Sequence, residues 1–377
     1  MLKKILSINL DWFARKSSQR FIPEIDALRF FAIIPVMLVH FSGALLSHNS
    51  SFDRALIDQE NNLRHILIQG NFGVHLFFAI SGFILTLPFL RNINGNISLK
   101  KYFLRRLIRI EPPYLIAITI FLVTHIALQE QSIAFLLERY FASFFYVHSA
   151  WFSSSSYILP VAWSLEIEVQ FYLLMPLLIY FIKFLKTAYW RAFIYILLLL
   201  TSIFIDILPF SDLNDFMLFF LAGIISADIY LNINIKKSVL WDFVFAICMF
   251  SFFAFNIDPL RFFLLVGIIV ASFNVVWLRK FLNNRLVTVI GGMCYSLYLL
   301  HYPLYHLMMK LFSNMFTVSN SFEWTYLVQS IIFVPISIVI MGGYFLLVEK
   351  PFMVLSQKMG KQVAQKSEIK KSSLPIN

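Results

Sequence analysis

The chain has 377 residues, of which 59% are apolar and only 14% are charged. Soluble domains are about 45–50% apolar and about 25% charged, so this composition excludes a soluble globular domain, a disordered chain and a small disulfide scaffold. The net charge of +11 is typical of nucleic-acid-binding proteins, but cytoplasmic loops of membrane proteins also collect Lys and Arg. We therefore predict a polytopic membrane protein with no nucleic-acid partner.

The two cysteines and the N-terminal residues give no sign of a disulfide, a metal site or a signal peptide. Cys248 and Cys294 each lie within an apolar run and far apart in sequence, so they indicate neither a disulfide framework nor a metal site. We expect no bound metal. The first 25 residues have basic side chains but no clean apolar core, so we expect no cleaved signal peptide.

Ten apolar runs have the length of about twenty residues that a membrane-spanning helix needs. A further stretch, 133–152, contains Glu138 and Arg139 and is predicted to be interfacial or re-entrant. If it spans the membrane, the count becomes eleven and the C-terminus changes side. The ten predicted spans are 27–46, 71–90, 112–129, 160–182, 191–208, 215–231, 241–257, 260–278, 286–309 and 324–348.

The distribution of basic residues predicts the orientation of this all-α bundle. With the N-terminus inside, 25 of the 31 Lys and Arg lie in cytoplasmic pieces and five lie in outer loops. Such an asymmetry follows the positive-inside rule and places both termini in the cytoplasm. We predict a cytoplasmic N-terminal segment over 1–25, a transmembrane domain over 26–350 and a short basic cytoplasmic tail over 351–377.

The first predicted span contains two ionisable residues, Arg29 and His40. An ionisable group at membrane depth costs several kcal/mol and faces a protein-lined cavity in most cases. The two residues are eleven positions apart, which places them on one face of a helix about 16 Å apart along its axis. They can engage two ends of one elongated ligand. The alternatives are an arginine that reaches the inner membrane surface and a histidine satisfied within the bundle.

A basic cluster, Arg105, Arg106 and Arg109, precedes the third span on the predicted cytoplasmic side. Arg106 and Arg109 are three residues apart and share a helix face. Guanidinium groups bind phosphate oxygens through paired hydrogen bonds, so the cluster favours a phosphate-rich ligand. Ordinary anchoring at the membrane surface explains the number of charges equally well, but not their spacing.

Two acids lie near the start of the fourth span. Glu168 shares a face with Ser164, and Tyr172 follows one turn later. Glu166 lies on a nearly opposite side. We predict that Glu168 faces a cavity and that Glu166 reaches the membrane interface, where an acid favours the start of a helix.

Taken in order, these motifs resemble the membrane-bound acyltransferase-3 family, the O-acetyltransferases of bacterial surface polysaccharides. The similarity runs from about residue 24 to 352. One such motif alone would be a weak signal, but all of them in the same order are highly specific for the family. One position differs, because His75 stands where the family has an acid, and its role stays open. The stretches that carry the resemblance are Glu24 to His40, with Arg29 and His40 as an Arg-x10-His pair, Gly73-Val74-His75-Leu76-Phe77-Phe78-Ala79-Ile80-Ser81-Gly82-Phe83, Arg106-x-x-Arg109, Trp163-Ser164-Leu165-x-x-Glu168, Tyr295 to Pro303 with His301, and Val348-Glu349-Lys350-Pro351.

The resemblance implies a multi-pass protein of the bacterial inner membrane. It implies transfer of an acyl group, acetyl in the first instance, from cytoplasmic acetyl-CoA to a hydroxyl of a surface or lipid-linked glycan such as O-antigen or capsule. The partners are then acyl-CoA, the glycan acceptor and membrane lipids. The implied catalytic residues are His40, Glu168 and Arg29. Arg105, Arg106, Arg109 and Arg29 would bind the donor, and Ser81, Trp163, Ser164, Tyr172 and His301 would line the substrate pocket.

His40 is the predicted general base, because imidazole titrates near neutral pH and can accept the proton of a hydroxyl. Glu168 can orient that imidazole or receive its proton. Direct transfer and an acyl-His40 intermediate both stay open. Two other functions also stay open. One is a transporter or flippase that uses Arg29, His40 and Glu168 as a substrate or proton path, and the other is a glycan polymerase.

Overall fold

The computed structural model describes residues 12–13, 22–92, 98–129, 131–184, 187–204, 211–313, 317 and 321–359. All regular secondary structure in these residues is helical, which confirms the all-α class. Most of the predicted cytoplasmic segment 1–25 and the end of the predicted tail 351–377 lie outside the described residues.

The first half of the chain forms eight α-helices and two short 3₁₀ turns. They are α2 (Pro23–His48), α3 (Arg54–Glu60), α4 (Asn62–Ile68), η1 (Gln69–Phe72), α5 (Gly73–Arg91), α6 (Leu99–Ala127), α7 (Ile133–Phe144), α8 (His148–Phe152), η2 (Pro160–Ala162) and α9 (Trp163–Phe184). The second half consists of α10 (Ala188–Phe204), α11 (Ser211–Asn232), α12 (Leu240–Ala254), α13 (Asp258–Asn274), α14 (Arg279–Leu282), α15 (Arg285–Gly292), α16 (Cys294–Phe312), α17 (Phe322–Tyr344) and a π-helical turn, η3 (Phe345–Glu349).

Six helical segments of the described chain are long and apolar enough to cross a membrane. They are Pro23–His48, Asn62–Arg91, Leu99–Ala127, Pro160–Ile182, Asp215–Asn232 and Phe322–Met359. Each coincides with one of the ten predicted spans. The other four predicted spans correspond to the shorter helices α10, α12 and α13 and to α15 and α16, which are separate helices. The count of ten spans and the sidedness of the termini therefore stay predictions.

The stretch 133–152 forms two short helices, α7 and α8, of 12 and 5 residues. Twelve residues rise about 18 Å, which is less than the roughly 30 Å of a hydrocarbon core. This stretch has the short, interrupted helices that we expected of an interfacial or re-entrant segment.

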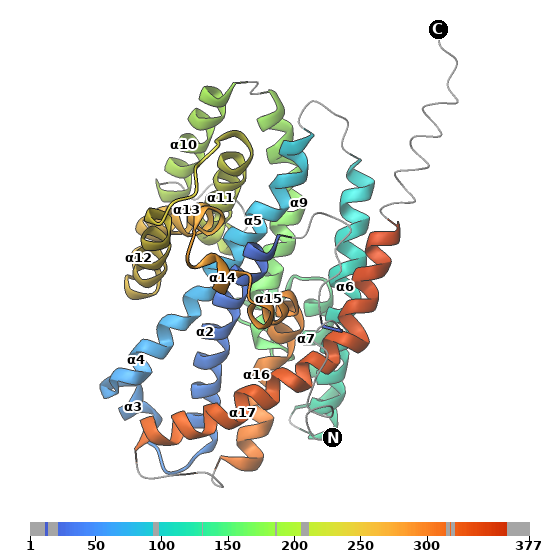
Figure 1. Cartoon of the computed structure of the whole chain (residues 1–377). Helices are drawn as coiled ribbons and strands as arrows, with labels where there is room; N and C mark the ends of the chain where they lie inside the picture. Colours follow the sequence, from blue (N-terminus) through green and yellow to red (C-terminus); the bar gives the residue numbers. More distant parts are fainter. Residues whose placement is uncertain are drawn as a thin grey trace, which may run out of the picture.

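Helix α2 lies in the interior of the molecule. It packs against α5, α15, α16 and α17, with α10, α12 and α13 on one side of it and α6 and α7 on the other (Figure 1). Apolar side chains cover most of its circumference, so neighbours can surround it without burying unpaired polar groups. Because Arg29 and His40 are both on α2, this central position brings residues from many helices towards them.

Glycine permits two close helix contacts in this core. A Cβ atom on Gly223 of α11 would lie 1.9 Å from the carbonyl oxygen of Ala79 on α5, and one on Gly291 of α15 would lie 1.7 Å from that of Asp26 on α2. Both distances are far below van der Waals contact, so the backbones themselves touch. Small residues allow this kind of approach between membrane helices, where packing replaces the hydrophobic effect as the attraction.

We expect that Gly223→Ala separates α5 from α11 and destabilises the protein by about 1–3 kcal/mol, as other overpacked cores do. The thermal unfolding midpoint of the detergent-solubilised protein measures this effect. Gly343→Ala is the matched control, since a Cβ there meets no atom within 4 Å. Equal midpoints for the two variants would contradict the close contact between α5 and α11.

Candidate functional site

A cavity of about 120 Å³ lies between α2, α5, α6, α9 and α16. We call it the arginine cavity, because Arg29, Arg106 and Arg109 lie in its wall. Its described lining includes seven of the eleven residues predicted for the site: Arg29, Ser81, Arg106, Arg109, Ser164, Glu168 and Tyr172. Side chains from five helices thus converge on one space.

Three guanidinium groups and one carboxylate line the arginine cavity. Arg29 donates a hydrogen bond to the carboxylate of Asp26, one turn earlier on α2. The guanidinium of Arg106 lies 5.5 Å from the ring centroid of Tyr172, so a cation faces an aromatic ring there. The wall carries more positive than negative charge, and an anionic ligand can balance it.

Arg105 does not line the arginine cavity. Its carbonyl oxygen accepts a hydrogen bond from Ser356 Oγ at 2.9 Å, which ties α6 to the segment after η3. The predicted donor-binding set therefore reduces to Arg29, Arg106 and Arg109 in the wall of this cavity.

Glu168 connects α9 to α5 within the cavity wall. Its Oε1 accepts hydrogen bonds from Ser81 Oγ, at 2.5 Å, and from the Tyr172 hydroxyl. Glu168 thus faces a cavity as predicted, and Ser81 and Tyr172 lie beside it. The predicted contact between Glu168 and His40 is absent from the described structure, because the two residues line different cavities.

Glu166 is buried, with only 2% of its surface exposed. Its carboxylate accepts a hydrogen bond from the backbone N–H of Ser149 at 2.9 Å, in the first turn of α8. Glu166 is thus covered by α8, which lies in the predicted interfacial or re-entrant segment, and its place at the membrane interface stays a prediction. Glu166 therefore accepts a hydrogen bond from a free backbone N–H at the start of α8, although Glu166 itself is on α9.

A second cavity has a volume of about 210 Å³, and we call it the histidine cavity. Its wall contains His40 from α2 and both Tyr302 and His306 from α16. The ring of His40 lies 5.1 Å from that of His301 and 5.3 Å from that of Tyr302, measured between centroids. In the part of the chain that the structure describes, no side chain forms a hydrogen bond with the His40 imidazole. The imidazole is therefore available to form a hydrogen bond with the hydroxyl of a ligand.

His301 is fully buried behind His40. Its Nδ1 lies 2.9 Å from the carbonyl oxygens of both Leu297 and Tyr298. Carbonyl oxygens only accept hydrogen bonds, so Nδ1 carries a hydrogen. Within the described residues Nε2 has no partner. His301 thus lies beside the candidate base and outside the lining of either cavity.

The two cavities follow one another along α2 and α16. On α2, Val36 lines the arginine cavity and His40, one turn later, lines the histidine cavity. On α16, Tyr298 lines the first and Tyr302, one turn later, lines the second. Arg29 and His40 therefore lie on the same side of α2 as predicted, and each belongs to a different cavity.

The family model described as an acyltransferase domain matches residues 22–345. The chain belongs to this acyltransferase family. With six helical segments able to cross a membrane among the described residues, it is a multi-pass membrane protein.

Several relatives come from Staphylococcus aureus. The O-acetyltransferase OatA of strain NCTC 8325 / PS 47 is 26% identical over 329 residues, which cover 76% of this chain and 51% of OatA. A further protein, from strain COL, is 24% identical over 335 residues, which cover 77% of this chain and 52% of its own length. Its name provisionally assigns it to the O-acetyltransferases. The chain thus spans about half the length of these relatives. No solved structure matches the chain significantly.

Trp163, which was predicted to line the substrate pocket, lies elsewhere in this acyltransferase, and the structure also shows the surroundings of His75. Trp163 packs against Phe216, with ring centroids 5.4 Å apart, and does not line either cavity. His75 stacks on Phe219 at 4.1 Å between centroids, within a group of aromatic rings. The imidazole at this position therefore makes a packing contact with the Phe219 ring.

The sequence interpretation missed the tyrosines of α16. The Tyr298 hydroxyl donates to the Val161 carbonyl and lies 3.1 Å from Ser164 Oγ, and Tyr295 donates to the Ile110 carbonyl at 2.9 Å. Tyr295, Tyr298 and Tyr302 recur at helical spacing, and this pattern could have revealed a shared polar face.

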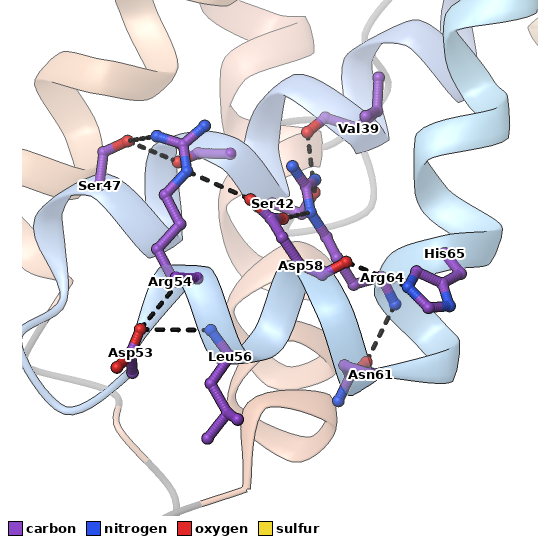
Figure 2. Close-up of polar contacts among 12 residues, drawn as sticks. Val39, Ser42, Ser47, Asp53, Arg54, Leu56, Asp58, Asn61, Arg64 and His65 are labelled. Carbon is purple, nitrogen blue, oxygen red and sulfur yellow. Dashed lines mark hydrogen bonds and ion pairs between the residues drawn. The ribbon is translucent and has the colours of Figure 1, made fainter.

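Arg54 and Arg64, which also line the histidine cavity, were not predicted as site residues. Arg64 Nη1 donates to Ser42 Oγ at 2.5 Å and its Nε to Asp58 at 2.7 Å, while Arg54 donates to Ser47 Oγ at 3.1 Å (Figure 2). Partial burial raises the pKa of Asp58, but the hydrogen bond and charge of Arg64 and the charge of Arg54 outweigh it and leave that pKa lowered. Asp58 is therefore ionised at neutral pH.

Proposed function

We propose that this chain is an integral membrane O-acyltransferase of the bacterial inner membrane. In this proposal it moves an acyl group, acetyl in the first instance, from cytoplasmic acyl-CoA to a hydroxyl of a surface or lipid-linked glycan on the periplasmic side. The observation that carries the proposal is the succession of a cation-lined cavity and a cavity containing His40 along α2. Membership of the acyltransferase family and relatives named O-acetyltransferase support it.

The arginine cavity suits the donor. Coenzyme A carries several phosphates, and guanidinium groups bind phosphate oxygens through charge-assisted paired hydrogen bonds. Arg106 and Arg109 lie one turn apart on α6 and share this wall with Arg29. The charge pattern predicts a cytoplasmic location for the start of α6, where acyl-CoA is available.

The histidine cavity suits the acceptor hydroxyl. We assign His40 as the general base that takes the hydroxyl proton while the oxygen attacks the thioester carbonyl. The new carbon–oxygen ester bond replaces the carbon–sulfur bond, and the proton passes from His40 to the departing thiolate. The neighbouring ring of His301 limits where the His40 imidazole can lie and makes His301 a positioning residue.

Glu168 takes a different role in this proposal from the one that the sequence suggested. Its carboxylate accepts hydrogen bonds from Ser81 and Tyr172, and Tyr172 in turn faces the Arg106 guanidinium. Glu168 therefore positions the ring against which Arg106 rests. It acts on the donor side and does not exchange a proton with His40.

We expect that Arg106→Ala and Arg109→Ala each raise the KM for acetyl-CoA by roughly ten-fold or more, since each removes charge-assisted hydrogen bonds. Arg→Lys at either position should restore binding only in part, because an ammonium keeps the charge and loses the paired geometry. Transfer kinetics of the purified protein measure both effects. Arg91→Ala is the control, as Arg91 is exposed and lies outside both cavity walls. Unchanged KM values would place the donor elsewhere.

We expect that His40→Ala lowers the transfer rate by about 10²–10⁴-fold, the usual contribution of a general base. The KM for acetyl-CoA should stay near its wild-type value, because His40 lies outside the arginine cavity. His65→Ala, an exposed histidine outside both cavities, is the control. Transfer by His40→Ala at the wild-type rate would remove His40 from the mechanism. A transporter would show no acyl transfer in the wild-type protein either.

Sidedness is tested by labelling cysteines introduced into a chain that lacks Cys248 and Cys294. Ser98 and Ser50 are exposed, and the charge pattern predicts opposite sides of the membrane for them. An impermeant thiol reagent applied to intact cells should label Ser50→Cys and leave Ser98→Cys unlabelled until the membrane is opened. Labelling of Ser98→Cys from outside would overturn the topology and the transfer direction.

A further inference from the structure

The wall of the histidine cavity contains two arginines that share one carboxylate. Arg64 Nε lies 2.7 Å from one oxygen of Asp58, and Arg54 Nε lies 3.5 Å from the other. Both arginines line the cavity, and no acidic side chain does so among the described residues. The two arginines and Asp58 together therefore carry one net positive charge at this wall.

The two arginines differ in what they are free to do. Arg64 has only 8% of its side chain exposed and is held between Asp58 and Ser42, so it links α3 and α4 to α2. Arg54 has 54% of its side chain exposed, and its contacts with the described residues are the hydrogen bond to Ser47 and the longer ion pair with Asp58. Figure 2 shows Arg54 extending from α3 towards Ser47. Arg64 is thus part of the framework, and Arg54 can turn its guanidinium towards a ligand.

We propose that the histidine cavity takes an anionic acceptor, a glycan in which a carboxylate or phosphate lies close to the hydroxyl that is acylated. This inference rests on the proposed function, since it assigns the acceptor to the cavity of the general base. Arg54 binds the anionic group, while Asp58 balances the charge of the buried Arg64.

The size of the cavity limits where the charge can lie. Its volume of about 210 Å³ is far larger than one water molecule requires, and it is small for several sugar residues. His40 and Arg54 line the same space. The anionic group and the reacting hydroxyl must therefore belong to the same sugar residue or to adjacent ones.

Equilibrium binding to the detergent-solubilised full chain tests the site without a transfer step. The probes are a uronic-acid oligosaccharide and its methyl ester, which differ in charge but not in hydroxyl groups, and a phosphorylated oligosaccharide with its unphosphorylated form. At least one anionic probe should bind about ten-fold more tightly than its neutral counterpart. If the preference appears for the uronic acid over its ester, the site recognises a carboxylate. If it appears for the phosphorylated probe, the site recognises a phosphate. Equal binding within both pairs would overturn the proposal.

Arg54→Gln should abolish this preference and leave binding of the neutral probes unchanged, and Arg54→Lys should keep part of it. Arg54 is half exposed, so its replacement leaves the Arg64–Asp58–Ser42 contacts in place. Lys310→Gln is the control, because it removes an exposed cation on the helix of His306 that does not line the cavity. A preference that survives in Arg54→Gln, or that Lys310→Gln abolishes equally, would contradict the role of Arg54.

Transfer from acetyl-CoA to the same probes separates this inference from the proposed function. Charge-selective binding that depends on Arg54, without acetylation of any probe, would support the anionic site and contradict the acyl-CoA-dependent activity. Acetylation of charged and neutral probes with the same KM, unaffected by Arg54→Gln, would support the activity and overturn the anionic site.

Discussion

The close backbone contact of α2 with its neighbours is the constraint on which the rest of this structure depends. The contact at Gly291 brings α15 against the start of α2, next to Arg29, without an intervening side chain. Since packing and not the hydrophobic effect attracts helices within a membrane, such contacts set the distances between the elements. Arg29 and His40 are both on α2, so the same contacts set the positions of both cavities.

The polar residues of the two cavities are held by their hydrogen bonds to other helices. Glu168 reaches Ser81 on α5, Tyr295 reaches the backbone of α6, and Tyr298 reaches η2 just before α9. At membrane depth an unpaired polar group is costly, so each of these bonds removes alternative arrangements of the helices. The network that satisfies these groups therefore also fixes the walls against which a donor and an acceptor can bind.

His75 shows how aromatic rings surround a buried imidazole in this structure. An acid there would need a buried cation or several donors, whereas the imidazole stacks on Phe219 and lies among other aromatic rings. Arg261, nearby in the same region, has its guanidinium carbon 3.2 Å from the centroid of Phe72 and its carboxylate partner at Asp258. Aromatic faces thus accommodate both groups.

The sequence by itself determined the all-α membrane class, six spans that the structure bears out, and the shared side of Arg29 and His40. These properties follow from local periodicity, which helix geometry converts directly into length and face. Only the tertiary structure decided that Arg29 and His40 belong to different cavities, that α8 buries Glu166 and that Arg54 and Arg64 join His40. Helix periodicity gives the direction of a side chain around its own axis, but which neighbour it meets depends on contacts between residues far apart in the chain.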